Sequence, residues 1–207
     1  GPTRPWAPYD PPLSALLDAQ APPPNEADGI RAAVAASEDA LAANDRDTAA
    51  RCFIDFWMGE GAWARTPDAR KDPIRDAIVN VSHWARALLG ESTPLSAFAA
   101  LRIPVLCMTG SRSPASSLGV ARLLGRTLPD VQLIEFDGLG HMGPVTHPEL
   151  VNAAIGGFLE EKRRALEAVG TLEQESELSR RQKGLAAARA AVTLQGAGTR
   201  PEEVEGP

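Results

Sequence analysis

Between residues 29 and 101, apolar residues recur three and four positions apart, a spacing that places side chains on one face of a helix. Ile30, Val34 and Leu41 follow this spacing, and Asn25 or Asp28 is the candidate cap before them. The pattern predicts a region that is almost purely helical, with helices over residues 29–43, 47–57, 74–89 and 95–101.

The pattern changes at Pro104, where a continuous apolar run begins. Residues 105–108 predict a strand buried on both faces, because no polar residue alternates with the apolar ones. A helical stripe over 120–128, a second strand over 131–136 and a helix over 148–159 follow. Strand, helix and strand within roughly 30 residues make a βαβ unit. We therefore predict an α/β fold with neighbouring parallel strands and a right-handed crossover.

The two ends of the chain differ from its middle. Prolines are dense before residue 25, which predicts an extended lead-in with at most a short helix over 13–19. From Glu160 the sequence is charged and rich in alanine, which predicts one or two exposed helices and a disordered end from Gly196. The expected organisation is a lead-in (1–29), a helical cap-like region (30–100), an α/β segment (101–163) and a tail (164–207).

Composition narrows the classes of function. The net charge is -6 and no basic tract occurs, so nucleic acid is not an expected partner. No apolar run approaches the roughly 18 residues of a membrane span, and we expect a cytoplasmic protein without a membrane partner. Cys52 and Cys107 lie among apolar residues and are expected to be buried, reduced thiols. No cysteine and histidine cluster predicts a metal, and we expect no cofactor.

One glycine-rich segment carries candidate chemistry. Residues 138–143 match the pattern GxGxxG directly after a predicted strand, as in dinucleotide-binding folds. Pro144 and Pro148 interrupt the helix that should follow, and no later strand supplies an acid for the ribose. The same loop is better interpreted as a tight turn that presents His141 at the end of the sheet, where a general base is useful.

The segment also resembles a known family. Ile103-Pro104-Val105-Leu106, Gly110, Pro114, Leu128-Pro129, Gly140-His141 and His147-Pro148-Glu149 are similar to the last two strands and the histidine turn of α/β-hydrolases. The resemblance spans about residues 45–160 and implies a partial hydrolase-like sheet with a helical cap region and a helical tail. It further implies cleavage of an ester or similar bond in a small apolar substrate, with His141 as catalytic base.

The triad acid departs from the family pattern. The position after the first strand where the family keeps its acid is Ser113, within Gly110-Ser111-Arg112-Ser113-Pro114, which contains no carboxylate. Some members of the fold carry the acid one strand earlier, and Asp10 stands about where that acid would lie. Asp10 is equally a turn former beside prolines, so both interpretations stay open.

The nucleophile is the second departure. No Gly-x-Ser-x-Gly occurs in the sequence, and in the family the nucleophile comes before the acid and the histidine. The resemblance implies that this elbow would precede Gly1, so the chain is expected to be inactive alone. The initial Gly-Pro fits either a protease scar or a fragment. Four serines on the turn or helix after the first strand are no substitute: Ser111, Ser113, Ser116 and Ser117.

The large aromatic residues of the helical region have two interpretations. They either line an apolar substrate pocket or form the helix-face core: Phe53, Phe56, Trp57, Trp63 and Trp84.

An alternative function is also open for the whole chain. An unpaired parallel sheet edge favours association, so a non-catalytic protein that needs a partner chain or forms a homo-oligomer is the second hypothesis. Residues 160–195 are the candidate association helix.

Overall fold

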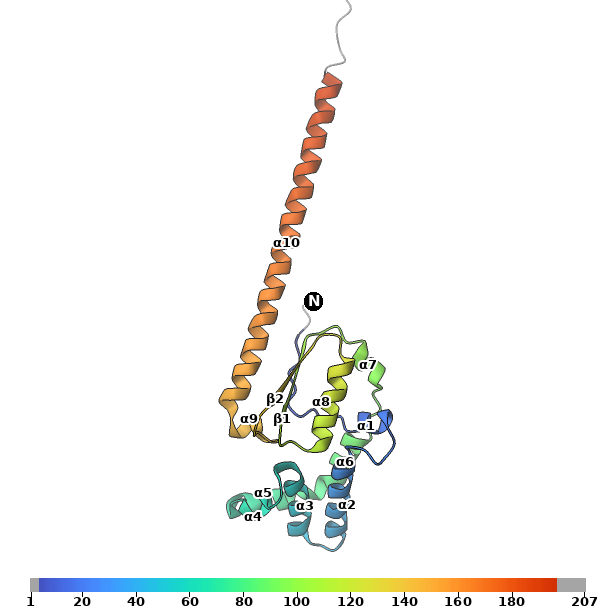
Figure 1. The fold of residues 1–207 in the computed structure, drawn as a ribbon, viewed down its shortest axis with the longest axis vertical. Coiled ribbons are helices and arrows are strands. Elements are labelled where there is room, and N and C mark those ends of the chain that lie inside the picture. The colour runs from blue at the N-terminus through green and yellow to red at the C-terminus, as the bar shows by residue number, and fades with distance from the viewer. Residues whose placement is uncertain (1–3, 197–207) are drawn as a thin grey trace, which may run out of the picture. The chain divides into compact units, whose positions relative to one another are not determined.

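The computed structural model describes residues 4–196, with side chains as far as residue 185. The chain divides into two compact units, the first ending at Phe158 and the second beginning at Leu159. The first unit contains the sheet and the helical region, and the second contains most of one long helix (Figure 1).

The predicted βαβ unit is confirmed. Strand β1 (Val105–Gly110) and strand β2 (Val131–Phe136) are parallel, in a register that pairs Val105 with Val131 and Gly110 with Phe136. Helix α8 (Ala115–Thr127) connects them. All six residues of β1 are buried, as its continuous apolar sequence predicts for a strand covered on both faces.

The proline-rich lead-in contributes a third row to this sheet. Trp6 and Tyr9 form parallel bridges to β1, on Val105 and Met108. The Trp6 N–H donates to the Pro104 carbonyl at 3.0 Å, and the Asp10 N–H donates to the Met108 carbonyl at 2.8 Å. Pro8 takes part through its carbonyl, which accepts from the Met108 N–H, so its missing N–H costs no bond here. The lead-in is extended, as predicted, and part of it belongs to the sheet.

The region between the lead-in and β1 is helical, as predicted (Figure 1). Its elements are α1 (Ala15–Gln20), α2 (Asp28–Ala42), α3 (Arg46–Met58), α4 (Ala62–Arg65), α5 (Asp68–Ala77), η1 (Ile78–Asn80), α6 (Val81–Leu89) and α7 (Leu95–Ala99). The cap of α2 was wrongly predicted, because Ala27 is the N-cap residue and Asn25 accepts the Ala27 N–H instead. Helix α3 is capped by Asp45, whose side chain accepts the Thr48 N–H at 2.9 Å.

Alternate side chains of β1 enter two separate cores. Val105 and Cys107 pack with α8 and the helical region, whereas Leu106 and Met108 pack with Leu139 and the start of the last helix. That helix, α10 (Pro148–Gly196), follows the single turn α9 (Gly143–Thr146) and contributes Val151 and Phe158 to the second core. Cys107 is a buried thiol as predicted.

The prediction of a buried Cys52 was wrong. Cys52 is a free thiol that is only partly covered, and it is not among the residues packed against the main core, although its neighbours Phe53 and Ile54 are. The apolar neighbours along the sequence therefore do not all share its helix face, since consecutive residues on a helix point in different directions.

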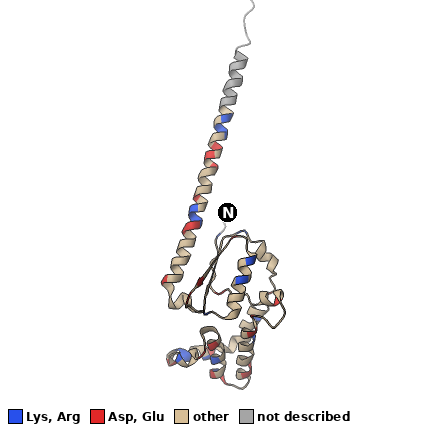
Figure 2. Cartoon of the chain, viewed as in Figure 1, with Lys and Arg blue, Asp and Glu red and all other residues tan. Residues whose placement is uncertain are grey.

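The second unit is the remainder of α10 from Leu159 to Gly196. Basic and acidic residues are interleaved along it (Figure 2). Arg163 forms an ion pair with Glu160 at 2.7 Å. The leucines of this unit as far as residue 185 are exposed, including Leu178 and Leu185 at 59% and 63%. The disordered end was predicted from Gly196. Gly196 itself is the last residue of α10, and the rest of the predicted end lies outside the described residues. Within residues 4–196, no helix combines the length and apolar character needed to cross a membrane.

Candidate active site

His141 lies in the turn that follows β2. Gly138 starts this turn with φ of +72°, a left-handed conformation that suits glycine. The Leu139 carbonyl accepts the Arg112 N–H at 2.8 Å, which ties the turn to the one after β1. Gly140 accepts the Gly143 N–H at 2.8 Å and closes the other side of the turn. His141 is therefore held at the carboxyl end of both strands, where parallel sheets place their functional groups.

Asp10 ends the third row of the sheet at the same edge. Its φ is +46°, within the left-handed region that aspartate tolerates better than most residues. Its side chain is fully buried, and its Oδ2 lies 3.0 Å from the His141 Nδ1. The structure thus brings together the two predicted site residues, which are 131 positions apart in the sequence. Asp10 is both a turn residue and the partner of the histidine.

The contact between Asp10 and His141 determines the chemistry open to the ring. An ionised carboxylate only accepts hydrogen bonds, so it selects the tautomer with a proton on Nδ1. Nε2 then carries the free lone pair and is able to accept a proton. When the ring takes up a proton, the nearby carboxylate stabilises the positive charge. This is the arrangement that a general base needs.

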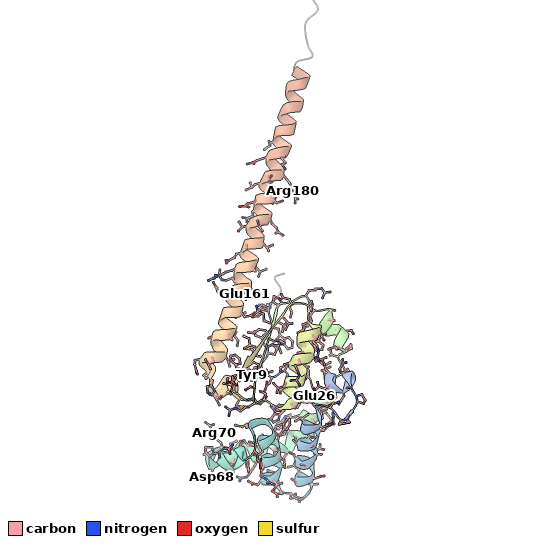
Figure 3. All side chains as sticks on the ribbon, in the orientation of Figure 1. Tyr9, Glu26, Asp68, Arg70, Glu161 and Arg180 are labelled. Atoms are coloured by element: carbon pink, nitrogen blue, oxygen red, sulfur yellow. The ribbon has the colours of Figure 1, made fainter. Side chains whose placement is uncertain are left out.

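Tyr9 supports the same turn and was missed by the sequence analysis. Its hydroxyl donates to the Gly140 carbonyl at 2.8 Å, and its ring stacks with Phe136 at 6.2 Å between centroids (Tyr9 is labelled in Figure 3). Burial, followed by the nearby charge of Asp10, raises the pKa of Tyr9 to about 12. The hydroxyl therefore stays protonated and donating. Nothing in the local pattern distinguishes this tyrosine from any other residue of a proline-rich segment.

Two cavities adjoin His141. One of about 630 Å³ is mainly apolar, with Phe53, Trp57 and Trp84 in its wall. The other, of about 380 Å³, is bounded by the His141 turn together with Arg112 and His147. Both cavities share four residues of their walls: Trp57, Met58, His141 and Met142. The two cavities therefore meet at His141.

The predicted aromatic residues divide between cavity and core. Trp57 packs closely on His141, with 4.4 Å between the ring centroids. Phe53 and Trp84 pack against each other, with 5.6 Å between their ring centroids, and both line the larger cavity. Trp63 is instead buried in the core, where its Nε1 donates to Asp47 at 3.1 Å. Phe56 also packs against the core.

No nucleophile contacts the imidazole among the described side chains. Ser113, at the position of the absent acid, is buried, and its hydroxyl accepts the Gly110 N–H at 3.1 Å. The Ser111 hydroxyl accepts the Gly138 N–H at 2.8 Å. Neither serine is hydrogen-bonded to His141, so both support the turns rather than the chemistry. In the same part of the chain, no cluster of histidine, cysteine and carboxylate residues is arranged to hold a metal ion.

No family model matches the sequence, and no curated protein matches it. MenH from S. aureus is a solved structure with 16% identity and a TM-score of 0.47, covering 67% of this chain and 55% of its own. An α/β hydrolase from Sphaerobacter thermophilus shows 25% identity and a TM-score of 0.46, with coverage of 72% and 57%. The enol-lactonase from Burkholderia xenovorans shows 15% identity and a TM-score of 0.47, with coverage of 60% and 48%.

The chain spans about half the length of these solved structures. These similar structures are α/β-hydrolase structures, the family that the sequence resembles, and the likeness covers only part of the chain. At these low TM-scores the likeness says nothing about chemistry. The candidate site is therefore defined by the geometry of Asp10 and His141.

Proposed function

We propose that Asp10 and His141 are the acid and base of a hydrolytic site that cleaves an ester or a similar bond. The observation that supports this proposal is the 3.0 Å contact between the buried Asp10 carboxylate and the His141 Nδ1. A carboxylate that is held in this way fixes the tautomer of the histidine and leaves Nε2 as the base. The adjoining cavity of about 630 Å³ suits an apolar acyl or alcohol group.

Asp10 and His141 would supply only the acid and the base of an acyl-transfer site, which also needs a nucleophile. The sequence has no Gly-x-Ser-x-Gly, and no serine, threonine or cysteine among the described side chains is hydrogen-bonded to His141. Without a nucleophile, His141 is left to activate water. Acyl transfer through a covalent intermediate then requires a nucleophile from another segment or a partner chain.

Hydrolysis of p-nitrophenyl butyrate by the purified chain tests the proposal. The missing elbow implies that the chain alone is inactive by the covalent route. For the water route we expect a slow, steady rate that is about 100-fold higher than that of His141→Ala, because a positioned general base typically contributes at least this factor. The time course should show no initial burst, because a burst requires a covalent acyl intermediate.

The matched control is His83→Ala, which removes an exposed histidine from α6 and should leave the rate unchanged. Equal rates for the wild-type chain and His141→Ala would contradict the proposal for this chain. A burst would show that the chain contains its own nucleophile and would overturn the assignment of half a site.

Association is the second candidate function, and two observations favour it. Among the described residues, the main-chain groups of Ala7 and Tyr9 have no main-chain partner, so the sheet has an open edge. In the second unit, Leu166 and Leu172 are 61% and 65% exposed. Sedimentation should show a concentration-dependent oligomer that Leu172→Glu weakens. A compact monomer at all concentrations would contradict this candidate.

A further inference from the structure

We infer that the smaller cavity beside His141 receives an anionic group of the substrate and that Arg112 is the residue that binds it. The inference deepens the proposed function, because it names the substrate class of the same site. The substrate would carry an apolar part in the larger cavity, the scissile bond at His141 and a carboxylate or similar anion toward Arg112.

Arg112 has the properties of a binding cation. It is exposed, it lines the cavity of about 380 Å³, and no ion pair joins it to a carboxylate among the described side chains. Its guanidinium donates to the Gly138 carbonyl, which positions the group beside the His141 turn. A guanidinium has five N–H donors, so further donors stay available for a planar anion.

The rest of the cavity wall agrees with this assignment. His147 is a second basic side chain in the lining, and the lining contains no aspartate or glutamate. Asp137, the nearest acid along the turn, is directed to the Ser111 hydroxyl at 3.4 Å. The local balance of charge in this cavity is therefore positive in a chain whose net charge is -6.

The arrangement of the two cavities determines which molecules fit. The larger cavity has mostly apolar walls, and the smaller one has Arg112 at its wall. Since both adjoin His141 and share Trp57, one molecule can occupy both at once. A neutral apolar ester would use only one of them.

Equilibrium binding of two matched probes tests this inference without any need for hydrolysis. The probes are 4-phenylbutyrate and its uncharged amide, which share the same apolar group. Binding is followed by tryptophan fluorescence, because Trp57 and Trp84 line the larger cavity. We expect the anion to bind about tenfold more tightly than the amide, a ratio typical of one charge-assisted contact. Added salt should reduce this ratio, since the guanidinium is exposed.

Variants of Arg112 assign the preference to this residue. Arg112→Gln should bring the two affinities to about the same value, whereas Arg112→Lys should keep part of the preference because it retains the charge. Arg126→Gln, which removes an exposed cation from the end of α8, is the control and should change nothing.

Equal binding of the two probes by the wild-type chain, failure of both to bind, or a preference that survives Arg112→Gln would overturn the inference. An Arg112-dependent preference without His141-dependent hydrolysis would support the anion site and contradict the proposed function. His141-dependent hydrolysis without an Arg112-dependent preference for the anion would support the proposed function and contradict the anion site.

Discussion

The polar and the apolar halves of the candidate site are held in place by different forces. Asp10 and His141 are positioned through the main chain, by hydrogen bonds from the Asp10 N–H to Met108 and from the Arg112 N–H to Leu139. Phe53 and Trp84 lie on α3 and α6 and are positioned by ring packing, with 5.6 Å between their centroids.

The difference indicates how each half should respond to change. Hydrogen bonds between parallel rows are directional and recur at set spacings, so they allow only one arrangement of the turns. Apolar packing is not directional, and similar side chains substitute for one another at modest cost. We therefore expect abrupt losses from changes at the sheet edge and gradual losses from changes in the helical wall.

Asp10→Asn should have the largest effect. The substitution keeps the shape of the side chain but removes the charge that stabilises a protonated imidazole. The His141-dependent hydrolysis should fall by about 100-fold, nearly to the rate of His141→Ala. The control is Asp137→Asn at the same sheet edge, an exposed acid that does not contact His141. Retention of most activity by Asp10→Asn would show that the buried contact is only structural.

Gly110→Ala tests how little space the sheet edge allows. A Cβ at this position would overlap the Leu139 carbonyl, which belongs to the backbone and cannot rotate away. We expect the free energy of unfolding in urea to fall by about 1–3 kcal/mol. Gly156→Ala, where a Cβ in α10 meets nothing, should instead raise it by about 0.5–1 kcal/mol. A neutral result at Gly110 would mean that the edge adapts as easily as the helical wall.

Tyr9→Phe should have a smaller effect that depends on pH. Loss of the hydrogen bond to Gly140 should lower the free energy of unfolding by about 1 kcal/mol at neutral pH. The pKa of Tyr9 is raised to about 12 in the folded protein. The protonated hydroxyl therefore contributes its full stabilisation of the fold at pH values below the pKa of an unfolded tyrosine, about 10. This stabilisation should disappear as pH rises toward 12. Denaturation curves at several pH values should show the two proteins converging, and a constant difference would argue against the buried phenol.

Trp84→Ala should have the smallest effect. Trp84 is 36% exposed at the cavity wall, so its removal widens the cavity without leaving a closed hole in the core. We expect binding of the uncharged 4-phenylbutanamide probe to weaken about threefold, with the free energy of unfolding changed by about 0.5 kcal/mol. If Trp84→Ala weakened binding by as large a factor as Asp10→Asn lowers hydrolysis, the expected difference between the polar and the apolar halves of the site would be contradicted.

Local patterns in the sequence were sufficient for much of this fold. Spacings of three and four predicted the helical region, and the order strand, helix, strand within a short stretch predicted β1 and β2 as a parallel pair. The glycines of residues 138–143, directly after the second predicted strand, predicted the tight turn that carries His141. These predictions succeed because each depends on residues that are close together in the chain, where helix and strand periods are directly visible.

The partners across the fold were decided by tertiary structure alone. The sequence left Asp10 open between a turn former and an acid, and its 3.0 Å contact with His141 joins residues 131 positions apart. The prolines of the lead-in hid its pairing with β1, and nothing marked Tyr9 or Arg112. The sequence left both Trp57 and Trp63 open between cavity wall and core, yet Trp57 lines a cavity and Trp63 lies in the core. A period reports which face of an element is apolar, whereas packing decides what that face meets.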